Sequence, residues 1–288
     1  MRSPLRSGAL VLALVAAAGA AAVELHENDA GPYVPTPTVI VDAMLELAEI
    51  RAGDVVYDLG SGDGRLVIAS ARRFGARGVG IDLQRRLVEM ARDNAKKAGV
   101  EDRVRFVEGD LFEADIRDAS VVMLYLLPQY VMRLVPRLRA ELRPGTRIVS
   151  HDYPLVPWRP DRQVEMDVEE KEWIVGTPWT KLYYYVVPAR VEGVWELSLP
   201  AALGSSLLAL ALAQEPDLLR GTVRDGAAEL PLRGLGVAGE RIRFGLTLAG
   251  RPIEIEGAVA DKTMTGEARS GEARGTWSAR YLGPLERK

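Results

Sequence analysis

The chain has no cysteine and only two histidines among its 288 residues. Without cysteine there is no disulfide, no thiolate nucleophile and no cysteine-based zinc site. His26 and His151 lie far apart in the sequence, which leaves few routes to a hydrolytic triad built on histidine. We therefore expect no metal centre.

Basic charge is not in excess either. The formal net charge is −3 and the isoelectric point is about 5.7, whereas a general nucleic-acid binder needs a concentrated basic face to neutralise phosphates. We expect no nucleic-acid partner. A hydrophobic content of 48% is ample for a packed core, and the length exceeds that of a usual single domain. Two domains are therefore expected.

The amino terminus combines two arginines, Arg2 and Arg6, with an uncharged apolar run at residues 8–23. This pattern predicts a secretory signal peptide and an exported or periplasmic protein. The run is short for a span of about 20 residues, but a membrane anchor at residues 8–23 remains an alternative. A cytoplasmic protein with a wrongly assigned start codon is another. The sequence indicates no oligomeric state.

Residues 55–64 read Val-Val-Tyr-Asp-Leu-Gly-Ser-Gly-Asp-Gly, a short apolar strand followed by a glycine-rich loop. Gly60, Gly62 and Gly64 lack a Cβ atom where the backbone must turn sharply against a ligand. A dinucleotide fingerprint would place a glycine one position later, where Arg65 stands. The loop therefore predicts a nucleoside cofactor other than NAD.

Three more strands are expected at residues 77–81, 104–108 and 120–126. Helices after Gly64 and after Asp82 are expected to follow their strands in βαβ fashion. Right-handed crossovers then build a parallel sheet. The strands run into Asp82, into Gly109-Asp110-Leu111 and into Leu127-Pro128. Pro128 and Pro136 predict that the following helix starts late or kinks. A closing antiparallel pair is expected within residues 162–187.

These motifs together resemble the class I S-adenosylmethionine-dependent methyltransferases. Three segments narrow the resemblance: Gly31-Pro-Tyr-Val-Pro-Thr-Pro-Thr38, the loop from Tyr57 to Arg65, and Val122-Met-Leu-Tyr-Leu-Leu-Pro128. They are similar to bacterial relatives of the mitochondrial protein-lysine methyltransferases that modify the adenine nucleotide translocase and the ATP synthase c-subunit. The similarity covers about Pro32 to Val187.

The resemblance implies an α/β fold with a Rossmann-like seven-stranded sheet, S-adenosylmethionine as cofactor, and methyl transfer to a lysine side chain of a protein. It implies that Asp82 binds the ribose hydroxyls, that Asp110 and Leu111 contact the adenine, and that Asp58 lies near the methionine ammonium. The full set of implied cofactor residues is Asp58, Gly60, Ser61, Gly62, Gly64, Asp82, Leu83, Asp110 and Leu111.

Aromatic residues are the candidates for the channel that admits the methyl acceptor. A desolvated channel can lower the pKa of a lysine amine without a dedicated base. Tyr33, Tyr125 and Pro128 are the predicted catalytic residues, whereas Tyr153 and Trp158 are either channel or packing residues. Two alternatives stay open: a small-molecule N- or O-methyltransferase, and a non-catalytic cofactor-binding protein of the cell envelope.

After Pro188 the sequence changes to short alternating segments separated by turns such as Asp225-Gly226. This pattern predicts a small antiparallel β-barrel whose interior is filled by Trp195 and Trp277. The expected division of the chain is residues 1–23 as leader or anchor, 24–188 as methyltransferase domain and 189–288 as β-rich accessory domain.

Overall fold

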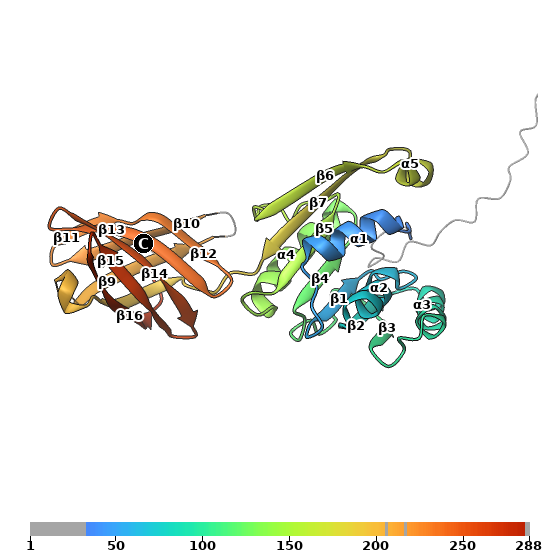
Figure 1. Cartoon of the computed structure of the whole chain (residues 1–288), viewed down its shortest axis with the longest axis horizontal. Helices are drawn as coiled ribbons and strands as arrows, with labels where there is room; N and C mark the ends of the chain where they lie inside the picture. The colour runs from blue at the N-terminus through green and yellow to red at the C-terminus, as the bar shows by residue number, and fades with distance from the viewer. Residues whose placement is uncertain (1–32, 205–206, 216–217, 286–288) are drawn as a thin grey trace, which may run out of the picture.

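The computed structural model describes residues 33–204, 207–215 and 218–285. The predicted leader at residues 1–23 lies outside this range. The described chain forms two sheets that lie side by side along the long axis of the molecule, one of seven strands and one of nine (Figure 1). Within these residues no helix has both the length and the apolar character needed to cross a bilayer.

The first sheet has the strand order β3-β2-β1-β4-β5-β7-β6. Strands β1 to β5 are parallel, and β7 runs antiparallel to both β5 and β6. The elements in chain order are α1 (Thr38–Leu47), β1 (Val55–Leu59), α2 (Arg65–Phe74), β2 (Arg77–Asp82), α3 (Arg85–Lys97), β3 (Val104–Glu108), β4 (Val121–Leu124), α4 (Pro128–Glu141), β5 (Arg147–His151), β6 (Arg162–Asp167), α5 (Glu169–Val175) and β7 (Trp179–Val186). The predicted seven-stranded α/β sheet is confirmed.

The strand order reverses between β1 and β4, where the chain leaves one half of the sheet for the other. In open parallel sheets this switch point leaves a crevice at the carboxyl ends of the strands. The residues that follow β1, β2, β3 and β4 therefore meet at one edge.

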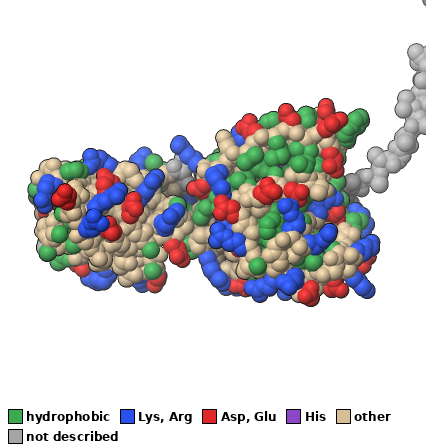
Figure 2. All heavy atoms as spheres, in the orientation of Figure 1, with side chains coloured by type: hydrophobic (Ala, Val, Ile, Leu, Met, Phe, Trp, Pro, Cys, Tyr) green, Lys and Arg blue, Asp and Glu red, His purple; other side chains and the backbone are tan. Residues whose placement is uncertain are grey.

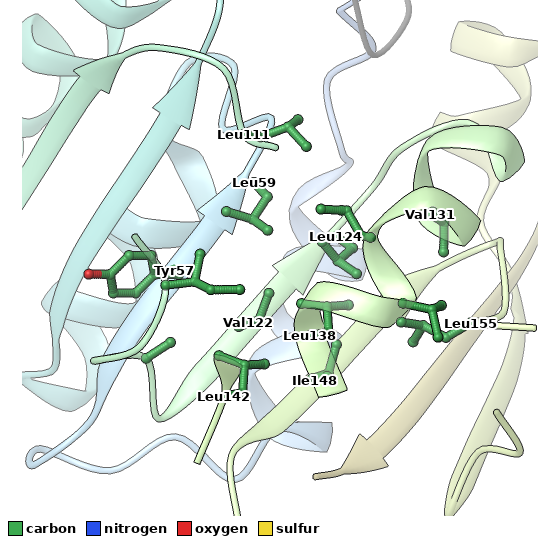
Figure 3. Close-up of a cluster of buried hydrophobic side chains, with 14 of the residues drawn as sticks. Tyr57, Leu59, Leu111, Val122, Leu124, Val131, Leu138, Leu142, Ile148 and Leu155 are labelled. Atoms are coloured by element: carbon green, nitrogen blue, oxygen red, sulfur yellow. The ribbon is translucent and has the colours of Figure 1, made fainter. Parts of the chain in front are cut away.

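Alternation along the strands gives the sheet two buried faces. Tyr57 and Leu59 of β1 pack with Leu138 of α4 on one face, whereas Val56 packs with Met44 of α1 on the other. Figure 3 shows the first cluster, in which Leu124 and Val122 of β4 face Leu138. Burial on both faces explains why these strands read as continuous apolar runs.

The second sheet has the order β11-β10-β9-β8-β16-β15-β14-β13-β12, all antiparallel, and it forms the predicted barrel-like body. Trp195 and Trp277 are buried in its core. Their ring N–H groups donate to the carbonyls of Val191 and Glu256, both at 2.9 Å. The strands are β8 (Gly193–Ser198), β9 (Leu207–Gln214), β10 (Leu219–Asp225), β11 (Ala228–Pro231), β12 (Arg233–Ala238), β13 (Arg241–Leu248), β14 (Arg251–Ala260), β15 (Thr263–Ser270) and β16 (Ala273–Gly283), with a short 3-10 helix at Ala201–Leu203.

Two expectations need correction. Helix α4 does not start late, because Pro128 is its first residue, a position that needs no backbone N–H donor. The closing pair β6 and β7 forms as expected, but helix α5 lies between its strands and was not predicted.

Candidate active site

A cavity opens at the carboxyl edge of the first sheet. Every predicted cofactor residue except Gly64 lines it, and so do Tyr33 and Tyr125. Gly64 instead precedes α2 in the left-handed conformation, with a φ of 81°, and packs beside Phe106. Pro128 is also absent from the lining residues and starts α4.

The glycine loop is tied to the neighbouring strand by backbone and carboxylate contacts. The N–H groups of Gly60 and Ser61 both donate to the carbonyl of Ile81, at 2.8 and 2.9 Å. One oxygen of Asp82 accepts from the Gly62 N–H at 2.8 Å, and the other accepts from the Gln84 N–H at 2.9 Å. Asp82 therefore both shapes the loop and faces the cavity.

Asp58 is buried at the end of β1. Burial, and then the nearby charges of Asp82 and Asp63, raise the pKa of the Asp58 carboxyl well above its usual range. A cationic group in the cavity would restore the ionised form. The buried hydroxyl of Ser61 has no hydrogen-bond partner among the described residues. Both features fit a ligand that brings an ammonium and further polar atoms.

Tyr33 closes the cavity from the segment before α1. A Cβ atom added to Gly62 would lie 2.4 Å from Cε2 of the Tyr33 ring, so this glycine makes room for an aromatic ring of the protein itself. Gly62 also has a φ of 53°, in the left-handed region. The ring therefore lies directly against the loop.

Arg65 holds this segment in place. Its guanidinium donates to the Thr36 carbonyl at 2.6 Å, to the Tyr33 hydroxyl at 3.4 Å, and to Asp63 at 2.7 Å. Burial would raise the pKa of Asp63, but the hydrogen bonds and charge of Arg65 outweigh it and lower that pKa. At the level of the sequence, Arg65 indicates only that the loop is not a dinucleotide fingerprint, which has a glycine at that position. No local sequence signal indicates that Arg65 contacts Tyr33 and Thr36.

At the end of β3, one oxygen of Asp110 accepts from the Phe112 N–H at 2.8 Å, which fixes the turn that follows the strand. Leu111 is buried, whereas Leu83 at the end of β2 is partly exposed. All three line the cavity. A carboxylate and two apolar side chains at this place suit a flat polar ring such as a nucleobase.

A second cavity lies beside the first and shares Val34, Tyr125 and Leu126 with it. The Tyr125 ring stacks on His151, with ring centroids 3.8 Å apart. Burial, and then Asp152 and Tyr153, raise the pKa of Tyr125, while burial lowers the pKa of His151 to about 4. Both rings are therefore uncharged at neutral pH.

Asp152 supplies a carboxylate to the second cavity. It lies 2.6 Å from the Lys171 ammonium and accepts from the Lys181 N–H at 3.2 Å. Lys171 also donates to the Trp179 carbonyl. The remaining lining residues are Leu127, Tyr153, Val175, Thr177 and Trp179. This carboxylate and its lysine partner were not predicted, because they come from segments that only the fold brings together.

Tyr153 and Trp158, each predicted to be either a channel or a packing residue, have different surroundings in the structure. Tyr153 lines the second cavity, whereas Trp158 is buried against Tyr185, with ring centroids 5.3 Å apart. Trp158 is thus a packing residue. Within the described ranges, histidine, aspartate and glutamate side chains form no group of three that could hold a metal ion.

Comparison with known proteins identifies the fold and the cofactor. Residues 58–162 match the model of the ANTKMT methyltransferase domain. A protein-lysine N-methyltransferase of Saccharolobus islandicus is 42% identical over 137 residues, which are 47% of this chain and 85% of that protein. The adenine nucleotide translocase lysine N-methyltransferase of Mus musculus is 40% identical over 130 residues, and the chain spans 56% of its length.

Solved structures are also similar, and one of them shares more than half of its sequence with the matched part of this chain. A protein described as an RNA methyltransferase from Salinibacter ruber, crystallised with S-adenosyl-L-homocysteine, is 51% identical, with a TM-score of 0.50. The match covers 55% of this chain and 96% of that one. Together with the cavity at the switch point, these matches show that the chain belongs to the ANTKMT methyltransferase domain family and is an S-adenosylmethionine-dependent methyltransferase.

Proposed function

We propose that the protein transfers a methyl group from S-adenosylmethionine to the amino group of a lysine side chain in a protein. The observation that carries the proposal is the second cavity, which adjoins the cofactor cavity through Tyr125 and Leu126 and has aromatic walls around the Asp152–Lys171 ion pair. Aromatic walls suit an alkyl amine or ammonium group. The lysine specificity of similar proteins supports the same substrate.

For the cofactor, we propose that Asp82 accepts hydrogen bonds from the ribose hydroxyls, that Asp58 pairs with the ammonium and that Asp110 and Leu111 hold the adenine. The cofactor supplies a methyl group that its sulfonium has already activated. The protein's task is then to orient the acceptor and exclude water. Burial in the aromatic cavity favours the neutral amine over the charged ammonium.

Charge favours a protein over RNA as the acceptor. Residues 163–175, which lead to the second cavity, contain five carboxylates and one lysine. The negative charge of residues 163–175 would repel RNA phosphates, whereas it would attract a polypeptide segment that carries a lysine. Because the Salinibacter ruber protein is described as an RNA methyltransferase, RNA is the alternative acceptor, and an experiment can distinguish it from a protein.

The test is methyl transfer from labelled S-adenosylmethionine into cell-envelope extract, total RNA and a small-molecule fraction. We expect label in protein, released as methyl-lysine on hydrolysis, and none with the Asp82→Ala variant. Label confined to RNA or to small molecules would contradict the lysine proposal. Binding of S-adenosylhomocysteine without transfer to any fraction would instead support a scaffold role.

We also propose that residues 1–23 direct export, with residues 24–188 as the catalytic domain and 189–288 as an accessory domain. Fractionation of the full chain, tagged at its carboxyl terminus, tests the compartment. Recovery in the periplasm is expected. Recovery in the cytoplasm would contradict export and would place the enzyme beside the usual supply of its cofactor.

A further inference from the structure

Helix α5 has an inverted distribution of side chains. Lys171 is 2% exposed, whereas Trp173, two residues later, is 85% exposed. Lysine is among the residues that proteins bury least, and tryptophan is buried on average. Some other interaction must therefore keep the helix in this orientation.

The buried ion pair fixes the helix. The Lys171 ammonium contacts Asp152 at 2.6 Å and donates to the Trp179 carbonyl, while Asp152 is itself bound to the backbone of β7. Turning Trp173 inward would separate these charges, and an unpaired buried charge costs several kcal/mol. The tryptophan is thus held outward by a contact inside the second cavity.

Four exposed apolar residues lie on α5 and at the start of β7, and we call them the α5 platform: Trp173, Ile174, Val175 and Trp179. Their exposed fractions are 85%, 39%, 40% and 46%. Figure 2 shows apolar side chains together with acidic ones over the β6, β7 and α5 region. Val175 and Trp179 also line the second cavity, so the α5 platform continues directly into it.

The border of the α5 platform is acidic. Glu169, Glu170 and Glu172 lie on the same helix, and Glu165 and Asp167 lie on the preceding strand. Lys171 is the one basic residue in that stretch, and it is buried in its ion pair. Lys181 of β7 pairs with Glu165 at 2.5 Å, so the excess negative charge comes from Asp167 and the three glutamates of α5. An apolar surface with this border complements a partner that is apolar and basic.

We propose that the α5 platform binds the polypeptide segment that carries the acceptor lysine, and that it selects segments whose flanking residues are apolar and basic. This inference rests on the proposed lysine methyltransferase function. Trp173 would cover an apolar flanking residue while the lysine enters the second cavity past Val175 and Trp179. Tryptophan side chains are typical of such energetically dominant contacts.

Two other occupants fit less well. A membrane surface rich in anionic phospholipid would face the acidic border and be repelled. A second copy of the chain, in a symmetric contact, would place the same glutamates against one another. The lysine-bearing segment satisfies both the apolar and the charged parts of the surface.

The experiment uses the full chain and three synthetic peptides that each contain one lysine. The first has leucine and arginine flanks, the second glycine and serine, and the third leucine and glutamate. We expect the lowest KM for the first. Trp173→Ala should raise that KM about tenfold with kcat changed less than about twofold, because the lost contact is made in binding and not in the transition state. Reversing Glu169, Glu170 and Glu172 to lysine should reverse the preference between the first and third peptides.

Leu207→Ala, an exposed apolar residue of the second sheet, and Glu272→Lys are the matched controls. Neither should alter any KM. The affinity for S-adenosylhomocysteine should be the same in all variants, which verifies that they are folded.

Equal KM values for the three peptides, with lysine methylated in each, would overturn the platform inference and leave the proposed function intact. No methylation of any peptide by a wild-type protein that binds S-adenosylhomocysteine would instead count against the proposed function. Trp173-dependent binding to phosphatidylglycerol vesicles, or Trp173-dependent dimerisation in sedimentation, would also overturn the inference.

Discussion

Substituting alanine for Gly62 should destabilise the domain that binds the cofactor, and so weaken cofactor binding, for two separable reasons. The first is conformational, since Gly62 has a φ of 53° and an alanine in the left-handed region costs about 1–2 kcal/mol. The second is steric, since the new Cβ would lie 2.4 Å from the Tyr33 ring. Displacing a packed side chain costs about 1–3 kcal/mol. Together the two costs should lower the free energy of unfolding by about 2–5 kcal/mol.

Gly99 provides a matched control. It has a φ of 67°, and no heavy atom lies within 4 Å of its added Cβ. Gly99→Ala should therefore lower the free energy of unfolding by the conformational cost alone, about 1–2 kcal/mol. The difference between the two variants isolates the contact with Tyr33.

The assay combines titration calorimetry of S-adenosylhomocysteine with urea unfolding. The relevant unfolding transition is the one that shifts when S-adenosylhomocysteine is added, because only the domain that binds it is stabilised. The Gly62→Ala/Tyr33→Ala double variant should recover the steric part. We expect a coupling free energy of about 1–3 kcal/mol between the two sites.

Two results would refute this reasoning. One is an equal loss of stability in Gly62→Ala and Gly99→Ala. The other is strict additivity in the double variant. Either would mean that the Tyr33 ring does not lie against the loop in solution.

Three further predictions concern charged groups. Burial raises the pKa of the Asp58 carboxyl, and pairing with the cofactor ammonium would lower it, so cofactor binding should release a proton. The cofactor affinity should therefore rise with pH between the pKa of the bound state and that of the free state. Calorimetry in buffers of different ionisation enthalpy measures the proton release, which Asp58→Asn should abolish. Lys171→Met should destabilise the protein by about 3–5 kcal/mol, and thermal unfolding should show partial recovery when Asp152→Asn is added. Arg65→Met should speed hydrogen exchange of the backbone amides near Tyr33, whereas unchanged protection would contradict the role of Arg65 as the anchor of that segment.

The strands of the catalytic sheet could be predicted because each signal is local. An apolar run that ends in a glycine or an acid, as at Asp58 and Asp82, indicates both the strand and the ligand edge at once. Helix α5 carries no such signal. It has seven residues, and the residue it buries is Lys171 while Trp173 is exposed. A hydrophobic pattern assigns the two residues to the wrong sides.

The contacts that close the site are long-range. Arg65 reaches the Thr36 carbonyl across 29 positions of sequence, and Lys171 reaches Asp152 across 19. Neither pair forms a motif, because the spacing depends on the lengths of the intervening helices and strands. Only the folded chain shows that Arg65 anchors the segment over the cavity.

Cofactor recognition and acceptor recognition therefore have different origins in this chain. The residues around the cofactor cavity follow strands β1 to β4 and lie mostly within residues 58–162, which match the family model. Helix α5 and Trp179 come after that match ends. A relative can thus share the cofactor site closely and still differ in what it methylates. The acceptor of this enzyme is best sought through the chemistry of residues 163–179, and the known substrates of its relatives are a weaker guide.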